Sequence, residues 1–414
     1  MVRPNLLWLF VLFAMTTHIY STPNPSRHGI RYDPEVYMNA SQLLTSKGYP
    51  CEEHEVPTDD GFILGLQRIP HGRLESQKVY YPKDDQPVVL LQHGLLSCSA
   101  CWLENLVNES LGYLMADNGL DVWLGNSRGN TYSRKHKTLS PSDPEFWEWS
   151  WDEMAMYDLP AMVDYILNVT NRKQLYYLGY SQGTQIAFSG LGLPWNTDKV
   201  KMFFAFAPVT TLGDIISPIR LLAPFVKPIQ TLYEIFGKSE FLPSTDIVKW
   251  LGRAACSKPG LDFICENVLF VLGGYDFKQM NESRIPVYVA NHPAGTSVQN
   301  IVHYAQSVLH KNFLMYDFGS EATNLARYNQ TTPPAWNASL VKTPTVVYSG
   351  SKDWLADPTD VNALLPEITN LVATKTMDEW EHLDFIWAMD APQQAYNDVI
   401  RRIHEQEAVE RNST

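Results

Sequence analysis

Runs of hydrophobic residues, each ending at a small or polar residue, recur along the chain and predict the strands of a sheet. The run at 87–92 is unbroken and leads into His93-Gly94, as expected for a strand buried on both faces. Helix-compatible segments lie between the runs, notably 152–168 and 391–405. This alternation predicts an α/β fold with a mostly parallel sheet. The predicted strands are 62–69, 87–92, 120–124, 175–180, 200–207, 345–348 and 371–377.

One interval between predicted strands is too long for a simple crossover. Pro208 and Thr343 are separated by about 135 positions, whereas a crossover needs roughly a dozen residues. The opening part of this interval is rich in Ile, Leu, Phe and Pro. We therefore expect a cap or lid domain over 210–335, inserted between two parts of the core domain, 22–209 and 336–414.

The first 21 residues have the pattern of a signal peptide. Arg3 supplies a positive charge, and the apolar run that follows at 6–15 is too short to span a bilayer. A buried N-terminal helix is the alternative. N-x-S/T sequons agree with entry into the secretory pathway, and their asparagines are candidates for glycosylation: Asn39, Asn108, Asn168, Asn281, Asn329, Asn337 and Asn412.

Charge and motif content narrow the possible partners. The formal net charge of −13 argues against nucleic acid and against anchoring on an anionic membrane surface. No later segment is long and apolar enough to span a membrane. No dinucleotide-binding, phosphate-loop or zinc-protease motif is complete. We therefore expect no cofactor and no metal, and the sequence identifies no protein partner.

The chain has five cysteines, an odd number, so at least one lacks an intramolecular partner. Cys256 and Cys265 are close enough in sequence for a short disulfide loop. Cys98 and Cys101 form a lone C-x-x-C, for which small core residues and a local disulfide are the two main interpretations. A zinc site is not favoured, because no second Cys or His pair lies nearby. The pairing of Cys51 stays open.

The strongest chemical signal is the pentapeptide 179–183, Gly-Tyr-Ser-Gln-Gly, which matches G-x-S-x-G. In this motif the serine lies on a sharp turn between a strand and a helix, with its hydroxyl exposed to substrate. An apolar run precedes Ser181 here, and a helix-compatible segment follows it. Ser181 is therefore the candidate nucleophile.

A serine hydroxyl needs a base, and the base needs an orienting acid. In this fold the chain order is Ser, then acid, then His. His382 follows the last predicted strand and is the candidate base. Asp353 follows the preceding strand and is the candidate acid. Asp357 and Asp360 are its rivals, although a place before proline and a place at a helix start are structural uses.

Ester hydrolysis also needs two backbone N–H donors for the oxyanion. Gln182 follows the nucleophile and supplies one of them. Leu95 is the expected second donor, because it lies in the loop after an earlier strand, where Gly94 permits close approach. We interpret His93 as a residue that holds this loop, since it precedes Ser181 in the chain.

Taken together, these segments resemble the gastric and lysosomal acid lipases over nearly the whole mature chain. Tyr180 is a departure, because that family usually has His before the nucleophile. The matching segments are 33–39, 48–50, 92–96, 122–130, 179–184, 353–358 and 382–385.

The resemblance implies an α/β-hydrolase fold: a mostly parallel, eight-stranded sheet flanked by helices, with a mainly helical cap that carries a mobile lid. It implies acid-pH hydrolysis of triacylglycerols or cholesteryl esters at an oil–water interface, outside the cell or in the lysosomal lumen. The residues it implies are a triad of Ser181, Asp353 and His382, oxyanion donors at Leu95 and Gln182, and a Cys256–Cys265 disulfide.

Two alternative functions stay open. One is a short-chain carboxylesterase or acyltransferase on the same fold. The other is a catalytically silent binding protein on a hydrolase scaffold. Silent proteins of that kind lose the nucleophile or the base, whereas this chain has every candidate group, which favours an enzyme. Fold alone does not fix function.

Overall fold

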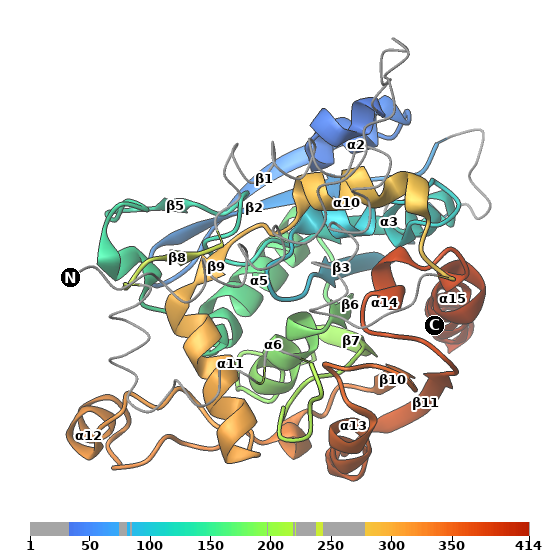
Figure 1. Cartoon of the computed structure of the whole chain (residues 1–414). Helices are drawn as coiled ribbons and strands as arrows, with labels where there is room; N and C mark the ends of the chain where they lie inside the picture. The colour runs from blue at the N-terminus through green and yellow to red at the C-terminus, as the bar shows by residue number, and fades with distance from the viewer. Residues whose placement is uncertain are drawn as a thin grey trace, which may run out of the picture.

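The computed structural model describes residues 33–73, 81–82, 85–196, 198–217, 220, 237–242 and 278–413. A twisted sheet runs through the middle of the molecule, with helices packed around it (Figure 1). Its strands lie in the order β1-β2-β4-β3-β6-β7-β10-β11. Their bounds are β1 (Glu52–Pro57), β2 (Phe62–Ile69), β3 (Val88–Gln92), β4 (Asp121–Leu124), β6 (Leu175–Tyr180), β7 (Val200–Phe206), β10 (Thr345–Gly350) and β11 (Leu371–Met377).

The sheet is parallel from β4 to β11 and antiparallel only at the β1-β2-β4 edge. The main path has the eight strands expected, and the two-residue strand β5 (Lys135–His136) pairs with β2 as a ninth. Every residue of β3 and of β6 is buried. These two central strands therefore bring their carboxyl ends, with the residues that follow, to the same edge of the sheet.

The two long predicted helices are present, and each contains a wider π turn. The first consists of α4 (Trp151–Glu153), the π turn η5 (Met154–Asp158) and α5 (Leu159–Thr170). The second consists of the π turn η10 (Pro392–Tyr396) and α15 (Asn397–Ser413). The other α-helices of the described residues are α2 (Ala40–Ser46), α3 (Leu111–Asp117), α6 (Gln182–Gly190), α10 (Ile285–Asn291), α11 (Val298–His310), α12 (Glu321–Tyr328), α13 (Pro358–Leu364) and α14 (Asp384–Trp387).

The predicted cap is described only in part. Its described elements are the short strands β8 (Glu240–Phe241) and β9 (Thr296–Ser297), which pair with each other, the 3-10 helix η7 (Glu282–Arg284), and the helices α10, α11 and α12. Ser297 caps α11 by accepting the amide of Asn300 at 2.9 Å. The predicted signal peptide and the Cys256–Cys265 pair lie outside the described residues. The domain boundaries therefore stay predictions.

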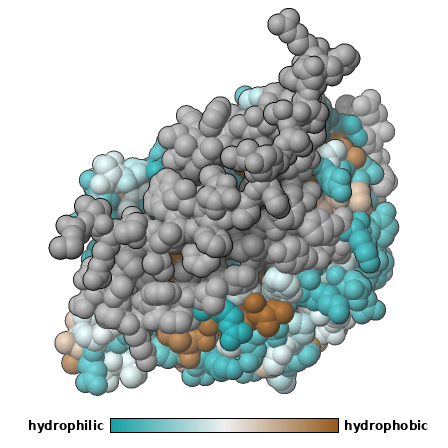
Figure 2. All heavy atoms as spheres, in the orientation of Figure 1, coloured by the Kyte–Doolittle hydropathy of each residue, from teal (hydrophilic) through white to brown (hydrophobic). Residues whose placement is uncertain are grey.

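Hydrophobic residues reach the surface in places. On the face seen in Figure 1, the described residues are mostly hydrophilic, with hydrophobic groups towards the lower edge (Figure 2). Ile216, near the start of the predicted cap, has 53% of its surface exposed. Within the described ranges, no helix is long and apolar enough to cross a membrane, and no group of His, Cys, Asp and Glu is arranged to hold a metal ion.

Candidate active site

Ser181 lies at the sharp turn between β6 and α6. Its backbone angles, φ 54° and ψ −117°, are strained for a residue with a side chain. The flanking glycines make the turn possible. A Cβ atom on Gly183 would come within 2.4 Å of the Gln92 carbonyl oxygen, and one on Gly179 within 2.6 Å of the Gly183 backbone. The glycine spacing of the motif is thus explained by close backbone packing.

Hydrogen bonds from neighbouring elements hold the strained turn. The Ser181 amide donates to the Phe206 carbonyl at the end of β7, over 3.0 Å. The Ser181 carbonyl accepts the amide of Thr184 at 2.8 Å and its hydroxyl at 2.6 Å. The turn is therefore tied to the adjacent strand and to the first turn of α6.

His382 and Asp353 lie beside this turn, on the loops that follow β11 and β10. The Ser181 hydroxyl is 2.8 Å from His382 Nε2. His382 Nδ1 is 2.8 Å and 3.0 Å from the two carboxylate oxygens of Asp353. All three side chains are buried. The structure thus brings together the three residues that sequence order had selected from loops far apart in the chain.

The Asp353 carboxylate is itself held in place. Its Oδ1 accepts the amides of Leu355 and Ala356, each at 2.8 Å. The rival carboxylates are engaged elsewhere. Asp357 caps α13 by accepting the Thr359 amide, and Asp360 accepts the Thr211 hydroxyl and the Asp214 amide. Of the three candidate carboxylates, Asp353 is the one that contacts the imidazole of His382.

The loop that carries Leu95 approaches the nucleophile closely. A Cβ atom on Gly94 would lie 3.0 Å from the Cβ atom of Ser181. The next turn is held by the predicted cap, because Ala294 donates its amide to the Leu96 carbonyl at 2.7 Å. Gln182 is the first residue of α6, so its amide has no partner within that helix. Gly94, which precedes Leu95, and Gln182 thus both lie next to Ser181, and the amides of Leu95 and Gln182 stay the candidate oxyanion donors.

His93 holds this loop, in agreement with the interpretation from sequence. Its Nδ1–H donates to the Gly94 carbonyl at 2.7 Å, and its Nε2 accepts the Ser127 amide and the Asn130 side-chain amide, each at 3.1 Å. The pKa of His93 is lowered to about 4, mainly by burial; the bond to Gly94 opposes the shift, and nearby His292 adds to it. The ring is thus neutral, in one tautomer, over the pH range above 4.

The segment after β4 supports the loop in turn, a role that the sequence analysis did not assign. Asn126 accepts the Ser99 amide at 2.9 Å and donates to the Gly65 carbonyl at 2.8 Å. Asn130 reaches both His93 and Asn126. In the sequence, both asparagines lie in the segment 122–130, which contributes to the family resemblance. Polar residues that satisfy buried backbone groups have no pattern of their own in a sequence.

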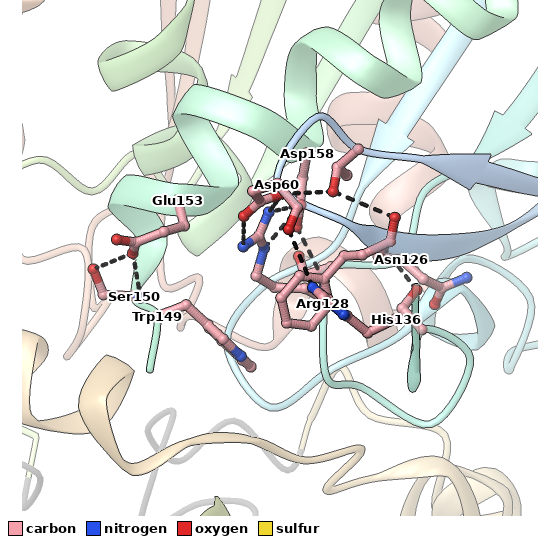
Figure 3. A network of polar contacts seen from close by, with 12 residues as sticks. Asp60, Asn126, Arg128, His136, Trp149, Ser150, Glu153 and Asp158 are labelled. Atoms are coloured by element: carbon pink, nitrogen blue, oxygen red, sulfur yellow. Dashed lines mark hydrogen bonds and ion pairs between the residues drawn. The ribbon is translucent and has the colours of Figure 1, made fainter. Parts of the chain in front are cut away.

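Arg128 lies in the same segment and ties it to two buried or half-buried carboxylates. In Figure 3 its guanidinium lies between the carboxylates of Asp60 and Asp158. The nearest contacts are 2.6 Å to Asp60 and 2.7 Å to Asp158, and Asp158 also accepts the Arg128 amide at 3.1 Å. Burial raises the pKa of Asp158, against the effect of Arg128. Glu153 faces the Ser150 amide nearby, at 2.7 Å (Figure 3).

The remaining candidate residues lie at the surface or in the core. Cys98 and Cys101 are buried in the hydrophobic core, and the thiol of Cys101 is in no disulfide. The structure therefore shows this pair as small core residues and not as a local disulfide. Among the glycosylation candidates, Asn281 is half-buried and the others are exposed, namely Asn39, Asn108, Asn168, Asn329, Asn337 and Asn412. Their glycosylation stays a prediction.

Comparison with known proteins shows which family this chain belongs to. Residues 87–388 match the family model of the alpha/beta hydrolase fold, and residues 40–106 match that of the partial alpha/beta-hydrolase lipase region. The human protein named lysosomal acid lipase/cholesteryl ester hydrolase is 50% identical over 369 residues, which are 89% of this chain and 91% of that protein. This chain belongs to the acid lipase family of α/β hydrolases. The resemblance inferred from the motifs is thereby confirmed.

Other relatives of this acid lipase family member agree. Rat gastric triacylglycerol lipase is 46% identical over 90% of this chain and 93% of its own. Human lipase member M is 44% identical over 97% and 93%. Among solved structures, a candidate lipase from Sulfolobus solfataricus superposes with a TM-score of 0.53 at 14% identity, covering 87% of this chain and 99% of its own. That likeness confirms the expected fold alone.

Proposed function

We propose that this chain is a carboxylic ester hydrolase, a lipase that cleaves lipid esters with Ser181, His382 and Asp353 as its catalytic triad. The observation that carries the proposal is the buried Ser181–His382–Asp353 series of hydrogen bonds, with 2.8 Å between hydroxyl and imidazole. Family membership and the lipase names of the relatives support ester hydrolysis as the reaction class.

The first half-reaction forms an acyl-enzyme. His382 Nε2 takes the proton of Ser181 as the hydroxyl oxygen attacks the ester carbonyl. Asp353 keeps the proton of the imidazole on Nδ1 and stabilises the imidazolium that forms. The Leu95 and Gln182 amides donate to the oxyanion of the tetrahedral intermediate. His382 then protonates the departing alcohol.

The second half-reaction releases the acid. Water takes the place of the alcohol, and His382 accepts its proton as the oxygen attacks the acyl carbonyl. The oxyanion forms again between the same two amides. Its collapse returns the electron pair to the carbonyl and breaks the bond to Ser181 Oγ, which recovers a proton from His382. The fatty acid then leaves.

We further propose that the substrates are triacylglycerols or cholesteryl esters, as the names of the relatives suggest, presented at an oil–water interface under acid conditions. The site of action is the lumen of the secretory pathway, the lysosome or the extracellular space.

Hydrolysis of triolein, cholesteryl oleate and a short-chain ester across pH 4–8 tests the proposal. A lipase turns over the long-chain esters, with greater activity on the acid side. Turnover of the short-chain ester alone would instead identify a carboxylesterase. Acyl transfer to added alcohols in preference to water would identify an acyltransferase, and no turnover of any ester by folded protein would leave the silent binding protein.

A further inference from the structure

Tyr180 precedes the nucleophile and has no part in the triad, yet it contacts the residue proposed as the base. Its hydroxyl donates to the backbone carbonyl of His382 at 3.0 Å. Its ring centroid lies 5.1 Å from that of the His382 imidazole, with 36° between the ring planes. The side chain is buried, with 3% of its surface exposed. One residue thus touches both the main chain and the side chain of His382.

The turn after His382 leaves this carbonyl available to Tyr180. Asp384 donates its amide to the Glu381 carbonyl at 3.3 Å, and Ile386 donates to the Leu383 carbonyl at 3.1 Å. The backbone bonds of the turn therefore use the carbonyls on either side of His382. A buried carbonyl without a donor is costly, and the Tyr180 hydroxyl supplies that donor.

The ring of Tyr180 is fixed on its other sides. A Cβ atom on Gly94 would lie 3.1 Å from the ring, so the loop that carries Leu95 packs directly against it. Trp102 packs edge-on, with 6.4 Å between centroids. Burial raises the pKa of the Tyr180 phenol well above its usual range, and Asp353, Cys101, Asp384 and Tyr396 add to the shift. The hydroxyl therefore keeps its proton and remains a donor at neutral and acid pH.

We propose that Tyr180 is a positioning residue that holds the base in register with the nucleophile. The hydroxyl anchors the main chain of His382, and the ring limits rotation of the imidazole, so that Nε2 stays on Ser181 and Nδ1 stays on Asp353. The inference rests on the proposed role of His382 as general base. It also explains how this chain accommodates tyrosine where the acid lipases usually have histidine, a side chain too short to reach the same carbonyl.

Tyr180→Phe tests the anchor, because it removes the hydroxyl and keeps the ring. A small misplacement of a catalytic group costs up to about a hundredfold in rate, so we expect kcat to fall roughly tenfold or more, with KM within about twofold of the parent value. The contact between His382 and Asp353 also becomes looser, so the acid limb of the kcat/KM profile should move to lower pH.

Tyr113→Phe is the matched control. Tyr113 is also buried and also donates its hydroxyl to a backbone carbonyl, that of Leu43 at 3.2 Å, between α3 and α2. Both variants lose one buried hydrogen bond of the same kind. Tyr113→Phe should be destabilised to a similar degree, with an unchanged pH profile.

All rates are divided by the concentration of sites labelled by a serine-directed phosphonate, so unfolded molecules do not count. Tyr180→His, a residue that the family tolerates, is the second variant and should lose the anchor as Tyr180→Phe does. Parent-like kcat and pH profile in both Tyr180 variants would overturn the inference, as would the same profile shift in Tyr113→Phe. Undiminished hydrolysis by Ser181→Ala would instead overturn the proposed function itself.

Discussion

At the scale of single residues, the backbone of Ser181 combines reactivity with strain. Its left-handed φ places the hydroxyl at the head of α6, and the surrounding strands keep it there. A residue in such a region costs about 1–3 kcal/mol unless it is glycine. Two substitutions at this one position therefore separate chemistry from strain.

Ser181→Ala and Ser181→Gly should both abolish ester hydrolysis and phosphonate labelling, since loss of a triad nucleophile costs several orders of magnitude in rate. Their stabilities should differ, because alanine keeps the strain and glycine relieves it. After the entropic cost of glycine, we expect Ser181→Gly to be about 1 kcal/mol more stable than Ser181→Ala in urea unfolding. Normal labelling of either variant would exclude Ser181 as the nucleophile.

The carboxylates offer a second comparison between residues. Asp353→Asn should lower kcat by roughly 10³–10⁴-fold, because an amide no longer enforces the productive tautomer of His382. Asp357→Asn and Asp360→Asn should change kcat by less than tenfold, since those side chains bind backbone amides and a threonine. Steady-state kinetics on a short-chain ester measures all three. A larger loss in Asp357→Asn at unchanged stability would mean that the triad acid is Asp357.

At the scale of elements, strands were predicted where burial leaves an unbroken apolar run. β3 and β6 are buried throughout and carry the clearest signal. β1 was missed, because it is an edge strand whose residues Glu52–Pro57 are mostly polar and exposed. The π turns were missed too, since a local widening of a helix has no sequence pattern. Chain order selected the triad candidates, but it could not reveal how Asn126 and Asn130 support the loop that carries Leu95.

His93, which holds the loop that carries Leu95, should limit stability and activity at low pH. The folded pKa of His93, about 4, lies below the ordinary value of 6.5, so the unfolded chain binds its proton first as the pH falls. Neutral His93 therefore contributes stability above pH 6.5 that is lost as the pH drops to 4, about 3 kcal/mol by linkage. Below that, a proton on Nε2 removes the bonds from Ser127 and Asn130.

We therefore expect kcat to fall reversibly near pH 4, before the molecule unfolds. Stopped-assay rates and near-ultraviolet circular dichroism, recorded together from pH 3 to 6, measure the two events. Recovery of the rate on return to pH 5 distinguishes a local change in the loop from denaturation. Activity that declines only together with the dichroism signal would contradict a local cause.

At the scale of the whole molecule, the long interval after β7 predicts control of access to Ser181. The described part of the interval already contacts the site, through the bond from Ala294 to Leu96. A lid that moves aside at a lipid surface excludes water until substrate arrives. Hydrolysis of a partly soluble ester should accordingly rise steeply once its concentration passes saturation and droplets form.

The measurement is initial rate against total ester, with the Ser181→Ala variant as the blank for spontaneous hydrolysis. A variant lacking residues 240–275 should lose the rise if it folds, as judged by circular dichroism. A rate that follows dissolved monomer alone, without preference for long chains, would contradict an interfacial lid and favour the esterase alternative.

The distance along the chain between nucleophile and base has a further consequence for biosynthesis. Ser181 and His382 are separated by 201 residues, and the ribosome adds about 5–20 residues per second. The nucleophile therefore emerges roughly 10–40 s before the base that activates it. During that time β10 and β11 have yet to join the sheet, so the growing chain has no triad. The growing chain therefore has no complete triad until the loop after β11 is made and the last strands dock.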